Sequence, residues 1–576
     1  MLKIYFEKLN PDIRIWVFTF IKIKEVFTLA TLNKNKAVAT APKEDKNVML
    51  NHEGGVVHKL NPLEVLFSKI QGSYMGESTF YEKRSPEKDF EEIKELVAGL
   101  SQEDAEYALK IAAIGRESNM ISYPLAVLTA CFNDNKYKGD NFKDKNGKTL
   151  MTGYTDKIVR RGRDITDILA NQVAMYGFES ETGKDGKPHR NMPLPIQERK
   201  QLKRKLEEFD EYQISKALGE RRLISMADAI KLLRPAGDKY EFFGKVISGK
   251  VSFANGKKQV QAELSKVNNK TSKSTKADVK KSVADTPLFV IVKNLVGMAR
   301  ADAIDEEVAE TIAQKLSSAE KVKASRIMPY QLYDAYKMFK GVAKTAPQKK
   351  ILNALVKAID LSCENVSEID GYTAYFVDLS GSMNMTISGM SSTTARELAA
   401  VLAAIGVKKS TCTVYAFANT CKKVDVNSSS TVVDIAEKIM NTNVGGATYL
   451  SDAIKTYINE SIAHENIIIL SDGDCYEYDS RRGLRFSSWG DNADNVINKA
   501  FTKKLVKRVF VNNLLGNKFA VVNTDDYRKN LVTGFTEKYI DEINFSIMLQ
   551  KEASDIRKVI DILYETYYPK TRKNRR

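Results

Sequence analysis

Hydrophobic residues recur at three- to four-residue intervals from about residue 48 to about residue 355, a pattern typical of amphipathic helices. Pro and Gly residues such as Pro124, Gly177, Pro235 and Pro287 separate these segments. The segments expected to be helical are Tyr123–Cys131, Arg163–Tyr176, Gln201–Leu218, Ser225–Leu233, Pro287–Ala299, Asp305–Leu316 and Tyr330–Phe339. Many helices with no intervening strand indicate an α-solenoid of packed helix pairs, with a degenerate repeat of no fixed period.

The pattern changes after Gly371, where short apolar runs alternate with helical segments. The first run is Thr373–Val377, and a helix is expected over Thr394–Ile405. The other expected strands are Cys412–Phe417, Asn466–Leu470, Arg508–Leu514 and Asn544–Met548. Alternating strands and helices predict a doubly wound parallel sheet, so the fold class is α + α/β.

These two patterns divide the chain into parts. We expect an N-terminal appendage and linker over 1–47, a helical domain over 48–365, an α/β domain over 366–565 and a basic tail over 566–576. Within the helical domain, about 251–285 is Lys-rich and poor in large apolar residues, so it cannot offset the entropy of ordering. We expect a mobile loop there, which limited proteolysis would cut first.

The distribution of charge along the chain indicates a class of binding partner. The 576 residues carry 89 Lys+Arg and 73 Asp+Glu, a net charge of +16. From Arg199 to Ala284 there are 21 basic and 10 acidic residues, a net of +11, so most of the excess lies in the helical half. Such an excess favours a polyanionic partner, although any single Lys-rich face is as often merely solvated.

Two features bear on location. The apolar stretch Ile13–Phe20 is followed by Lys22, Lys24 and Glu25, so it is too short to span a membrane and we expect no membrane partner. The five Cys residues are far apart and form no CxxC pair, which argues against a disulfide framework or a zinc site. We therefore expect a reducing, cytoplasmic location.

Oxygen-bearing side chains follow two of the expected strands. Asp378, Ser380 and Ser382 come directly after Thr373–Val377, and Asp472 follows Asn466–Leu470. The Gly445-Gly-Ala-Thr448 loop between them supplies a further hydroxyl. Ligands of such sheets bind beyond the carboxyl ends of the strands. An all-oxygen set with few carboxylates suits Mg²⁺, or else Mn²⁺.

This arrangement resembles the metal-ion-dependent adhesion site of von Willebrand factor A domains. By position, the resemblance assigns metal-binding roles to Asp378, Ser380, Ser382, Thr448 and Asp472. Thr448 is the departure, because the family more often has Gly-Gly-Thr where this chain has Gly-Gly-Ala-Thr. The alternative is a von Willebrand A fold whose site binds no metal.

A helical half followed by such a domain resembles the TROVE-domain proteins, the family of the sixty-kilodalton Ro autoantigen. The resemblance runs from about 48 to about 565 and indicates a bacterial or phage source. Its motifs are Asn51–Val57 with Asn61-Pro62, Ser225–Pro235, Lys293–Leu295, Ser325–Pro329, and Arg508–Asn523 with Gly534-Phe535.

The resemblance implies a monomeric ring of HEAT-like repeats closed by the A domain. It implies binding of small noncoding Y-like RNA on a basic outer surface, and of the 3′ ends of misfolded RNA through the central hole. In bacteria it further implies work with an exoribonuclease in RNA maturation and decay. Basic residues neutralise phosphates, so they are the expected RNA contacts. The candidates are Arg160, Arg161, Arg163, Lys203, Arg204, Lys205, Lys216, Arg221, Arg222, Lys231 and Arg234, with Tyr212 for stacking.

Three functions remain open from the residues. The first is a non-catalytic RNA-binding protein for RNA quality control or maturation. The second is a protein-binding module whose metal binds an acidic residue of a partner and which serves as a scaffold for a nuclease or another partner. The third is a hydrolase, which the sequence disfavours because four His residues form no catalytic set and two-metal chemistry needs more clustered carboxylates.

Overall fold

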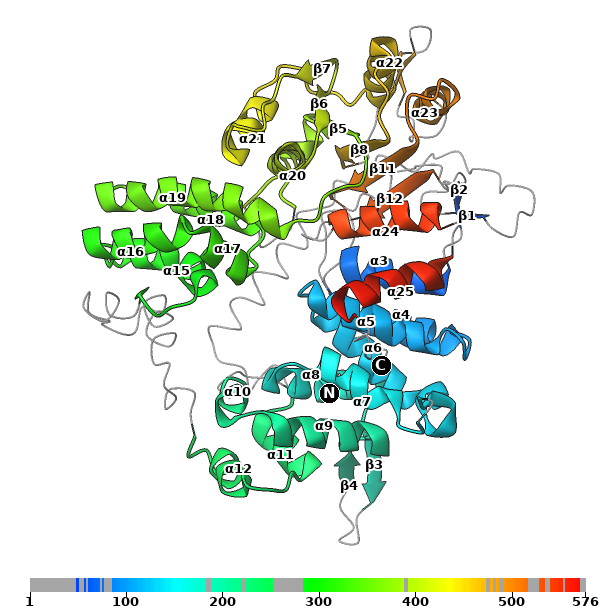
Figure 1. Cartoon of the computed structure of the whole chain (residues 1–576), viewed down its shortest axis with the longest axis vertical. Coiled ribbons are helices and arrows are strands. Elements are labelled where there is room, and N and C mark those ends of the chain that lie inside the picture. The colour runs from blue at the N-terminus through cyan, green and yellow to red at the C-terminus, as the bar shows by residue number, and fades with distance from the viewer. Residues whose placement is uncertain are drawn as a thin grey trace, which may run out of the picture. The chain divides into compact units, whose positions relative to one another are not determined.

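The computed structural model of the chain is shown in Figure 1. Its contacts divide it into residues 1–46 and residues 47–576. The structure describes residues 48–50, 56–58, 61–72, 75–76, 85–144, 146–182, 188–218, 223–251, 283–387, 392–472, 477–479, 483–485, 492–515, 528–533, 539–552 and 555–569. The expected appendage over 1–47, most of the expected Lys-rich loop (252–282) and the end of the basic tail (570–576) lie outside these residues.

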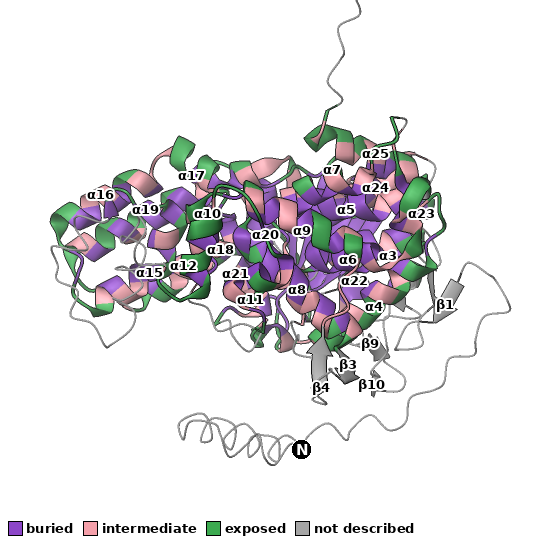
Figure 2. Ribbon diagram, turned by 90° about the horizontal axis from the view of Figure 1, so that it is seen from below, coloured by how far each residue is buried: buried purple, intermediate pink, exposed green. Residues whose placement is uncertain are grey.

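A first group of helices follows the short hairpin of β1 (Val48–Leu50) and β2 (Val56–His58). These helices bury one continuous apolar core, in which the largest fully buried side chains include Tyr123, Phe132 and Phe67. In Figure 2 the buried residues are dense along α5 and α6. The group consists of α3 (Pro62–Gly72), α4 (Pro86–Gly99), α5 (Ala105–Glu117), α6 (Ser122–Asn133), α7 (Leu150–Ile158), α8 (Gly162–Tyr176), α9 (Ile196–Glu208), α10 (Glu211–Ser215), α11 (Met226–Leu233) and α12 (Tyr240–Ile247).

Two details of this group differ from the sequence expectation. The predicted helix over Gln201–Leu218 is two helices, because Asp210 accepts a hydrogen bond from the Gln213 amide and begins α10. A hairpin of β3 (Glu179–Thr182) and β4 (Pro188–Asn191) lies between α8 and α9, where no strand was expected. Both strands are short and carry no apolar run, so they have no periodic signal.

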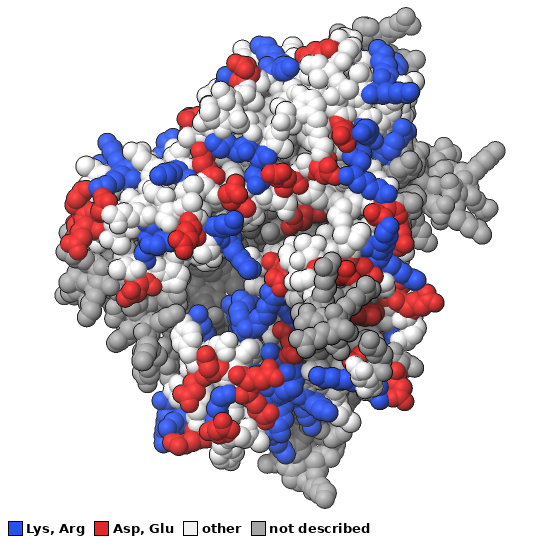
Figure 3. All heavy atoms as spheres, in the orientation of Figure 1, with Lys and Arg blue, Asp and Glu red and all other residues white. Residues whose placement is uncertain are grey.

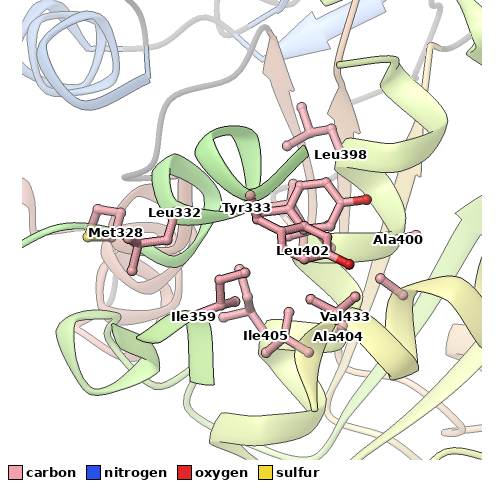
Figure 4. Packing of buried hydrophobic residues seen from close by; sticks show 14 of the residues in the cluster. Met328, Leu332, Tyr333, Ile359, Leu398, Ala400, Leu402, Ala404, Ile405 and Val433 are labelled. Atoms are coloured by element: carbon pink, nitrogen blue, oxygen red, sulfur yellow. The ribbon is translucent and has the colours of Figure 1, made fainter. Parts of the chain in front are cut away.

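A second group of helices precedes the sheet. It consists of α15 (Leu288–Arg300), α16 (Glu306–Leu316), α17 (Ala319–Ser325), α18 (Pro329–Lys340) and α19 (Ala346–Ser362). Thr345 and Gln348 form a capping box that begins α19. Figure 4 shows Leu332 and Tyr333 of α18 and Ile359 of α19 packed against Leu402 and Ile405 of α20 (Ala395–Lys409). The second group therefore shares its core with the sheet.

The α/β part contains a six-stranded sheet in the order β12-β11-β8-β5-β6-β7. All neighbouring pairs are parallel except β6 with β7. Residues alternate along β5, so that Tyr375 and Val377 join one core and Ala374 and Phe376 join the other. The strands are β5 (Thr373–Asp378), β6 (Cys412–Phe417), β7 (Cys421–Val424), β8 (Asn466–Ser471), β11 (Arg508–Asn513) and β12 (Lys529–Thr533).

Helices cover both faces of this sheet. α20 and α21 (Val432–Met440) belong to one apolar core, and α22 (Leu450–Glu460) and α23 (Asn492–Thr502) belong to the other. β9 (Glu477–Asp479) and β10 (Gly483–Arg485) form a separate hairpin. A helix-rich chain with a mostly parallel, doubly covered sheet is therefore confirmed.

The expected strand over Asn544–Met548 is wrong, because these residues lie in helix α24 (Tyr539–Lys551). This helix is buried on two sides. Ile543 and Ile547 join the core of the sheet, whereas Phe545 stacks on Phe67 of α3 with ring centroids 3.8 Å apart. Burial on two sides produces the apolar alternation of a strand within a short window, which periodicity alone cannot distinguish.

The last helix, α25 (Ile556–Tyr567), returns to the first helical group rather than to the sheet. Val559 and Ile560 are fully buried in that core. Around them, Lys110 of α5 pairs with Asp561 at 2.6 Å, and Arg557 pairs with Asp104 at 2.8 Å. Within the described residues, no helix has both the length and the apolar character needed to cross a membrane.

Candidate metal centre and basic surface

The Asp-x-Ser-x-Ser sequence forms a tight loop at the carboxyl end of β5. Asp378 is fully buried, and its Oδ1 accepts a hydrogen bond of 2.8 Å from the Ser380 amide. The hydroxyls of Ser380 and Ser382 lie 3.2 Å apart. Arg396 of α20 donates to the carbonyl oxygens of Leu379 and Met440. The first of these contacts ties the loop to α20. The loop therefore gathers one carboxylate and two hydroxyls at one end of the strand.

The Gly-Gly-Ala-Thr loop is held against this site by Asn419, which follows β6. Its Oδ1 accepts hydrogen bonds from the amides of Gly446 and Ala447 at 2.5 and 2.7 Å. Gly445 has φ +94°, and a Cβ there would lie 2.3 Å from Asn419 Oδ1, so only glycine fits. The Gly381 amide donates to the Gly446 carbonyl at 2.9 Å. These contacts place Thr448 beside the Asp-x-Ser-x-Ser loop.

A second buried carboxylate comes from the neighbouring strand. β8 runs parallel to β5, and its last residue, Ser471, donates to Asp378 Oδ2 at 2.6 Å. Asp472 follows at once and is 0 % exposed. Burial, and next the charge of Asp472, raise the pKa of Asp378. Two neighbouring buried carboxylates leave negative charge that a bound cation would offset.

The donor set fits a hard divalent cation. The Thr448 hydroxyl is buried and makes no hydrogen bond to any described residue, so its lone pairs remain available. The five predicted side chains supply only oxygen, which suits Mg²⁺ or Mn²⁺. Among the described residues, no three His, Cys, Asp or Glu side chains gather as a metal site, so any cation here would depend on the hydroxyls.

Sequence reasoning missed Asn419 and Ser471. Asn419 stands two residues after the predicted strand Cys412–Phe417, and a polar residue at a strand end is a signal that could have found it. Its role depends on reaching Gly446 and Ala447, more than 25 positions further along the chain. Only the folded chain shows that contact.

The predicted RNA contacts at the start of α8 are largely engaged within the protein. Arg160 donates to Glu117 at 2.5 Å and to the Tyr568 hydroxyl at 2.9 Å. Arg161 binds Asp164 through two of its nitrogens, at 3.0 and 2.7 Å. Arg163 is half-exposed and lies 3.4 Å from Asp167. Of these three, Arg163 is the most available to a ligand.

On α9, neighbouring basic residues also differ in how far acidic partners within the protein engage them. Arg204 pairs with Asp156 at 2.7 Å and also with Glu208. Lys205 is 9 % exposed, pairs with Glu208 at 3.0 Å and lies over the Phe209 ring. Lys203 lies 4.0 Å from Glu207 and is more exposed. In Figure 3, basic side chains gather over the region of α9 with acidic ones beside them.

The remaining candidates are more open. Lys231 and Arg234 are exposed, and Arg234 ends α11 with a left-handed backbone at φ 48°. Lys216 is exposed, and its Nζ lies 4.8 Å from the centre of the Tyr212 ring. That contact makes Tyr212 a partner of a cation within the protein. Arg221 and Arg222 lie outside the described residues.

Comparison with known proteins identifies the fold. No protein-family model matches the chain, and no curated protein does. Among solved structures, the Ro (RSR) protein of Deinococcus radiodurans aligns with a TM-score of 0.56, covering 84 % of this chain and 99 % of that one at 16 % identity. This chain has the Ro fold. The alignment takes in nearly the whole of the Ro protein, so the Ro fold accounts for both the helical groups and the sheet.

Other solved structures match only locally. Proximal thread matrix protein 1 of the mussel byssus covers 40 % of this chain and 57 % of its own at 15 % identity, with a TM-score of 0.20. The PilB minor pilin of Streptococcus sanguinis covers 35 % and 63 % at 15 % identity, also with a TM-score of 0.20. TM-scores this low indicate no shared fold over the chain.

Proposed function

We propose that this chain is a non-catalytic RNA-binding protein of the Ro ribonucleoprotein type. It would bind small Y-like RNAs on its basic surface and the 3′ ends of misfolded RNAs, for RNA quality control or maturation, and would act together with an exoribonuclease. The observation that carries the proposal is the Ro fold, which extends over 84 % of this chain.

The charges support the same proposal. Lys203, Lys216, Lys231 and Arg234 lie in the helical half, and among the predicted RNA contacts that the structure describes they are the cations least committed to acidic partners. Exposed cations bind RNA by displacing counterions from phosphates, so affinity depends on salt. Structured RNA is recognised mainly by shape and backbone, which a surface of this kind provides.

The test compares two variants with the same loss of charge. One replaces Lys203, Lys216, Lys231 and Arg234 with Ala, and the control replaces Lys321, Lys323, Lys349 and Lys357, which are exposed on α17 and α19. Filter binding of a structured RNA should weaken in the first, and the slope of log K against log salt should flatten by about 0.7–0.9 per lost contact. Equal affinities in the two variants, or no RNA binding by the wild type at moderate salt, would sink the proposal.

The metal centre favours a second function beside the first. We infer that Asp378, Ser380, Ser382, Thr448 and Asp472 hold Mg²⁺, or Mn²⁺ in its place. A cation held by so few protein charges keeps an open position for a carboxylate of a protein partner. The buried, uncommitted Thr448 hydroxyl supports this inference. The domain would then act as a metal-dependent protein-binding module and scaffold.

Binding of a partner would be tested by pull-down from ribonuclease-treated lysate with and without EDTA. A partner that is captured only with Mg²⁺, and is lost on Asp378→Ala, would support the module. Hydrolysis is tested separately with labelled RNA and Mg²⁺. Cleavage that Asp378→Ala abolishes would replace the non-catalytic proposal with a nuclease.

A further inference from the structure

The loops around the candidate metal centre are free of charged residues apart from the two aspartates of the site. Residues 379–395 after β5, 418–421 after β6 and 440–451 around Thr448 contain no Lys, Arg, Asp, Glu or His. The whole chain is 28 % charged, so this absence distinguishes one edge of the sheet. The segment directly after Asp472, 473–476, lies outside the described residues. We therefore define the neutral rim by the described residues of the other three loops, which are 381–387, 418–420 and 441–447.

The charged side chains that flank these loops are engaged within the protein. Arg396 donates to two backbone carbonyls, as described above. Lys337 of α18 pairs with Glu397 at 2.6 Å. Asp452, in the first turn of α22, pairs with Lys455 at 2.8 Å. These flanking groups therefore add little free charge that could attract a distant ligand.

The metal centre itself would be balanced in charge. Asp378 and Asp472 are both 0 % exposed, and their two negative charges match the two positive charges of Mg²⁺. One carboxylate of a partner could complete the coordination of the cation at short range. A phosphate backbone or a run of acidic residues would bring further negative charges, and the rim holds no cation to offset them.

An exposed apolar side chain stands in the same loop as two of the proposed ligands. Met385 is 45 % exposed, three residues after Ser382. Its backbone is fixed, because its amide donates to the Ser382 carbonyl at 3.1 Å and its carbonyl accepts from the Ala395 amide at 2.9 Å. Methionine adapts its shape to apolar partners. Protein interfaces are enriched in Met and depleted in Lys, Glu and Asp at their centres, which matches this rim.

We propose that the neutral rim selects a protein segment that carries one carboxylate flanked by uncharged, apolar residues. The carboxylate would meet the cation, and an apolar neighbour would pack on Met385. This inference rests on the proposed metal-dependent binding function and names the class of partner segment. An acidic tract would leave both the lack of rim cations and the exposure of Met385 unexplained.

The first test selects phage-displayed random short peptides on the full-length protein in Mg²⁺ and elutes them with EDTA. The recovered peptides should each hold a single Asp or Glu beside Leu, Ile, Met or Phe, with few other charges. Release by EDTA from the wild type reports metal dependence without a variant. Selection on Asp378→Ala in parallel should yield no such peptides.

The second test measures the affinity of a recovered peptide by fluorescence anisotropy. Affinity should change by less than about threefold from low to moderate salt, because no rim charge is there to be screened. Met385→Ala should weaken binding about fivefold or more, as truncation of a central interface residue does. The matched control is Met338→Ala, which removes a methionine of α18 that is 50 % exposed, and it should stay within about twofold of wild type.

The outcomes separate the rim from the metal-dependent function. Recovery of peptides with runs of Asp or Glu overturns the neutral rim and leaves metal-dependent binding intact, and so do equal effects of Met385→Ala and Met338→Ala. Failure to recover any peptide that EDTA releases overturns the metal-dependent binding function and the rim with it.

Discussion

Several residues of this protein adopt a backbone conformation that glycine would adopt at lower cost. Arg234 and Arg326 both end helices with a positive φ, of 48° and 54°. A left-handed non-glycine residue costs roughly 1–2 kcal/mol. Keeping arginine at such a position is understandable where the side chain binds something, and Arg234 is among the proposed RNA contacts.

This pair of arginines gives a matched test. Arg234→Gly should raise the free energy of unfolding by up to about 1 kcal/mol and weaken RNA binding, because backbone strain and the proposed phosphate contact would be lost together. Arg326→Gly should give a similar gain in stability with RNA affinity unchanged. Urea unfolding and filter binding of both variants measure the two effects. Weaker binding in both variants would show that Arg234 has no special role.

The two glycines of the Thr448 loop differ in whether a Cβ would fit, so they also provide a matched pair of variants. Gly445→Ala should destabilise the protein by at least about 1 kcal/mol and reduce any Mg²⁺-dependent rise in melting temperature, because its Cβ would meet Asn419 at 2.3 Å. Gly446→Ala is the control, since no atom lies within 4 Å of a Cβ there. Thermal melts in Mg²⁺ and in EDTA decide the matter, and similar behaviour of the two variants would contradict the geometry.

At the scale of elements, the junction of α24 with α3 contains a buried acid. Glu542 is 7 % exposed and accepts a hydrogen bond from the Ser68 hydroxyl. Burial raises the pKa of this carboxyl from 4.5 to about 7. The folded state therefore holds this proton more tightly than the unfolded chain does. The resulting stability is complete below pH 4.5 and is lost as pH rises through about 7.

Comparing the pH dependence of stability in the wild type and in Glu542→Gln isolates the contribution of the Glu542 carboxyl. Between pH 5 and pH 8 the free energy of unfolding of the wild type should fall by about 3 kcal/mol because of this carboxyl, at 1.36 kcal/mol per unit of pKa shift. Glu542→Gln has no carboxyl to ionise there, so its free energy of unfolding should not show this fall. Urea midpoints of the two proteins should therefore diverge as pH rises. Glu565→Gln, on the exposed side of α25, should track the wild type. Parallel pH profiles for Glu542→Gln and wild type would show that the carboxyl is not buried as described.

At the scale of the whole molecule, the two proposed sites use different chemistry on different parts of the fold. The candidate metal centre consists of oxygens that follow β5 and β8 together with the Thr448 hydroxyl in the loop before α22. The proposed basic surface belongs to α9, α10 and α11. Asp378→Ala should thus lower Mg²⁺ affinity and leave RNA affinity within about twofold. Isothermal titration with Mg²⁺ and filter binding with RNA provide the two readouts. A matching loss of RNA affinity in a folded variant would show that the sites are coupled.

Local patterns in the sequence were enough to predict many elements of the fold and to nominate the side chains of the candidate metal site, whose metal binding stays a prediction. Buried parallel strands read as continuous apolar runs, and functional groups follow them directly, so Asp378, Ser380 and Asp472 could be named from order alone. Helices such as α16 and α18 repeat their apolar positions at helical spacing, which is also a local property.

Tertiary structure alone decided which charges are free and which elements meet. Arg160 reaches Tyr568, Arg204 reaches Asp156, and Lys110 reaches Asp561, and each partner is distant in the chain. The same holds for Asn419 and the Thr448 loop, and for the two-sided burial that makes α24 a helix. Sequence patterns report the neighbours of a residue along the chain. Ion pairs, grooves and contacts of α25 with α5 depend on neighbours in space, which exist only once the chain has folded.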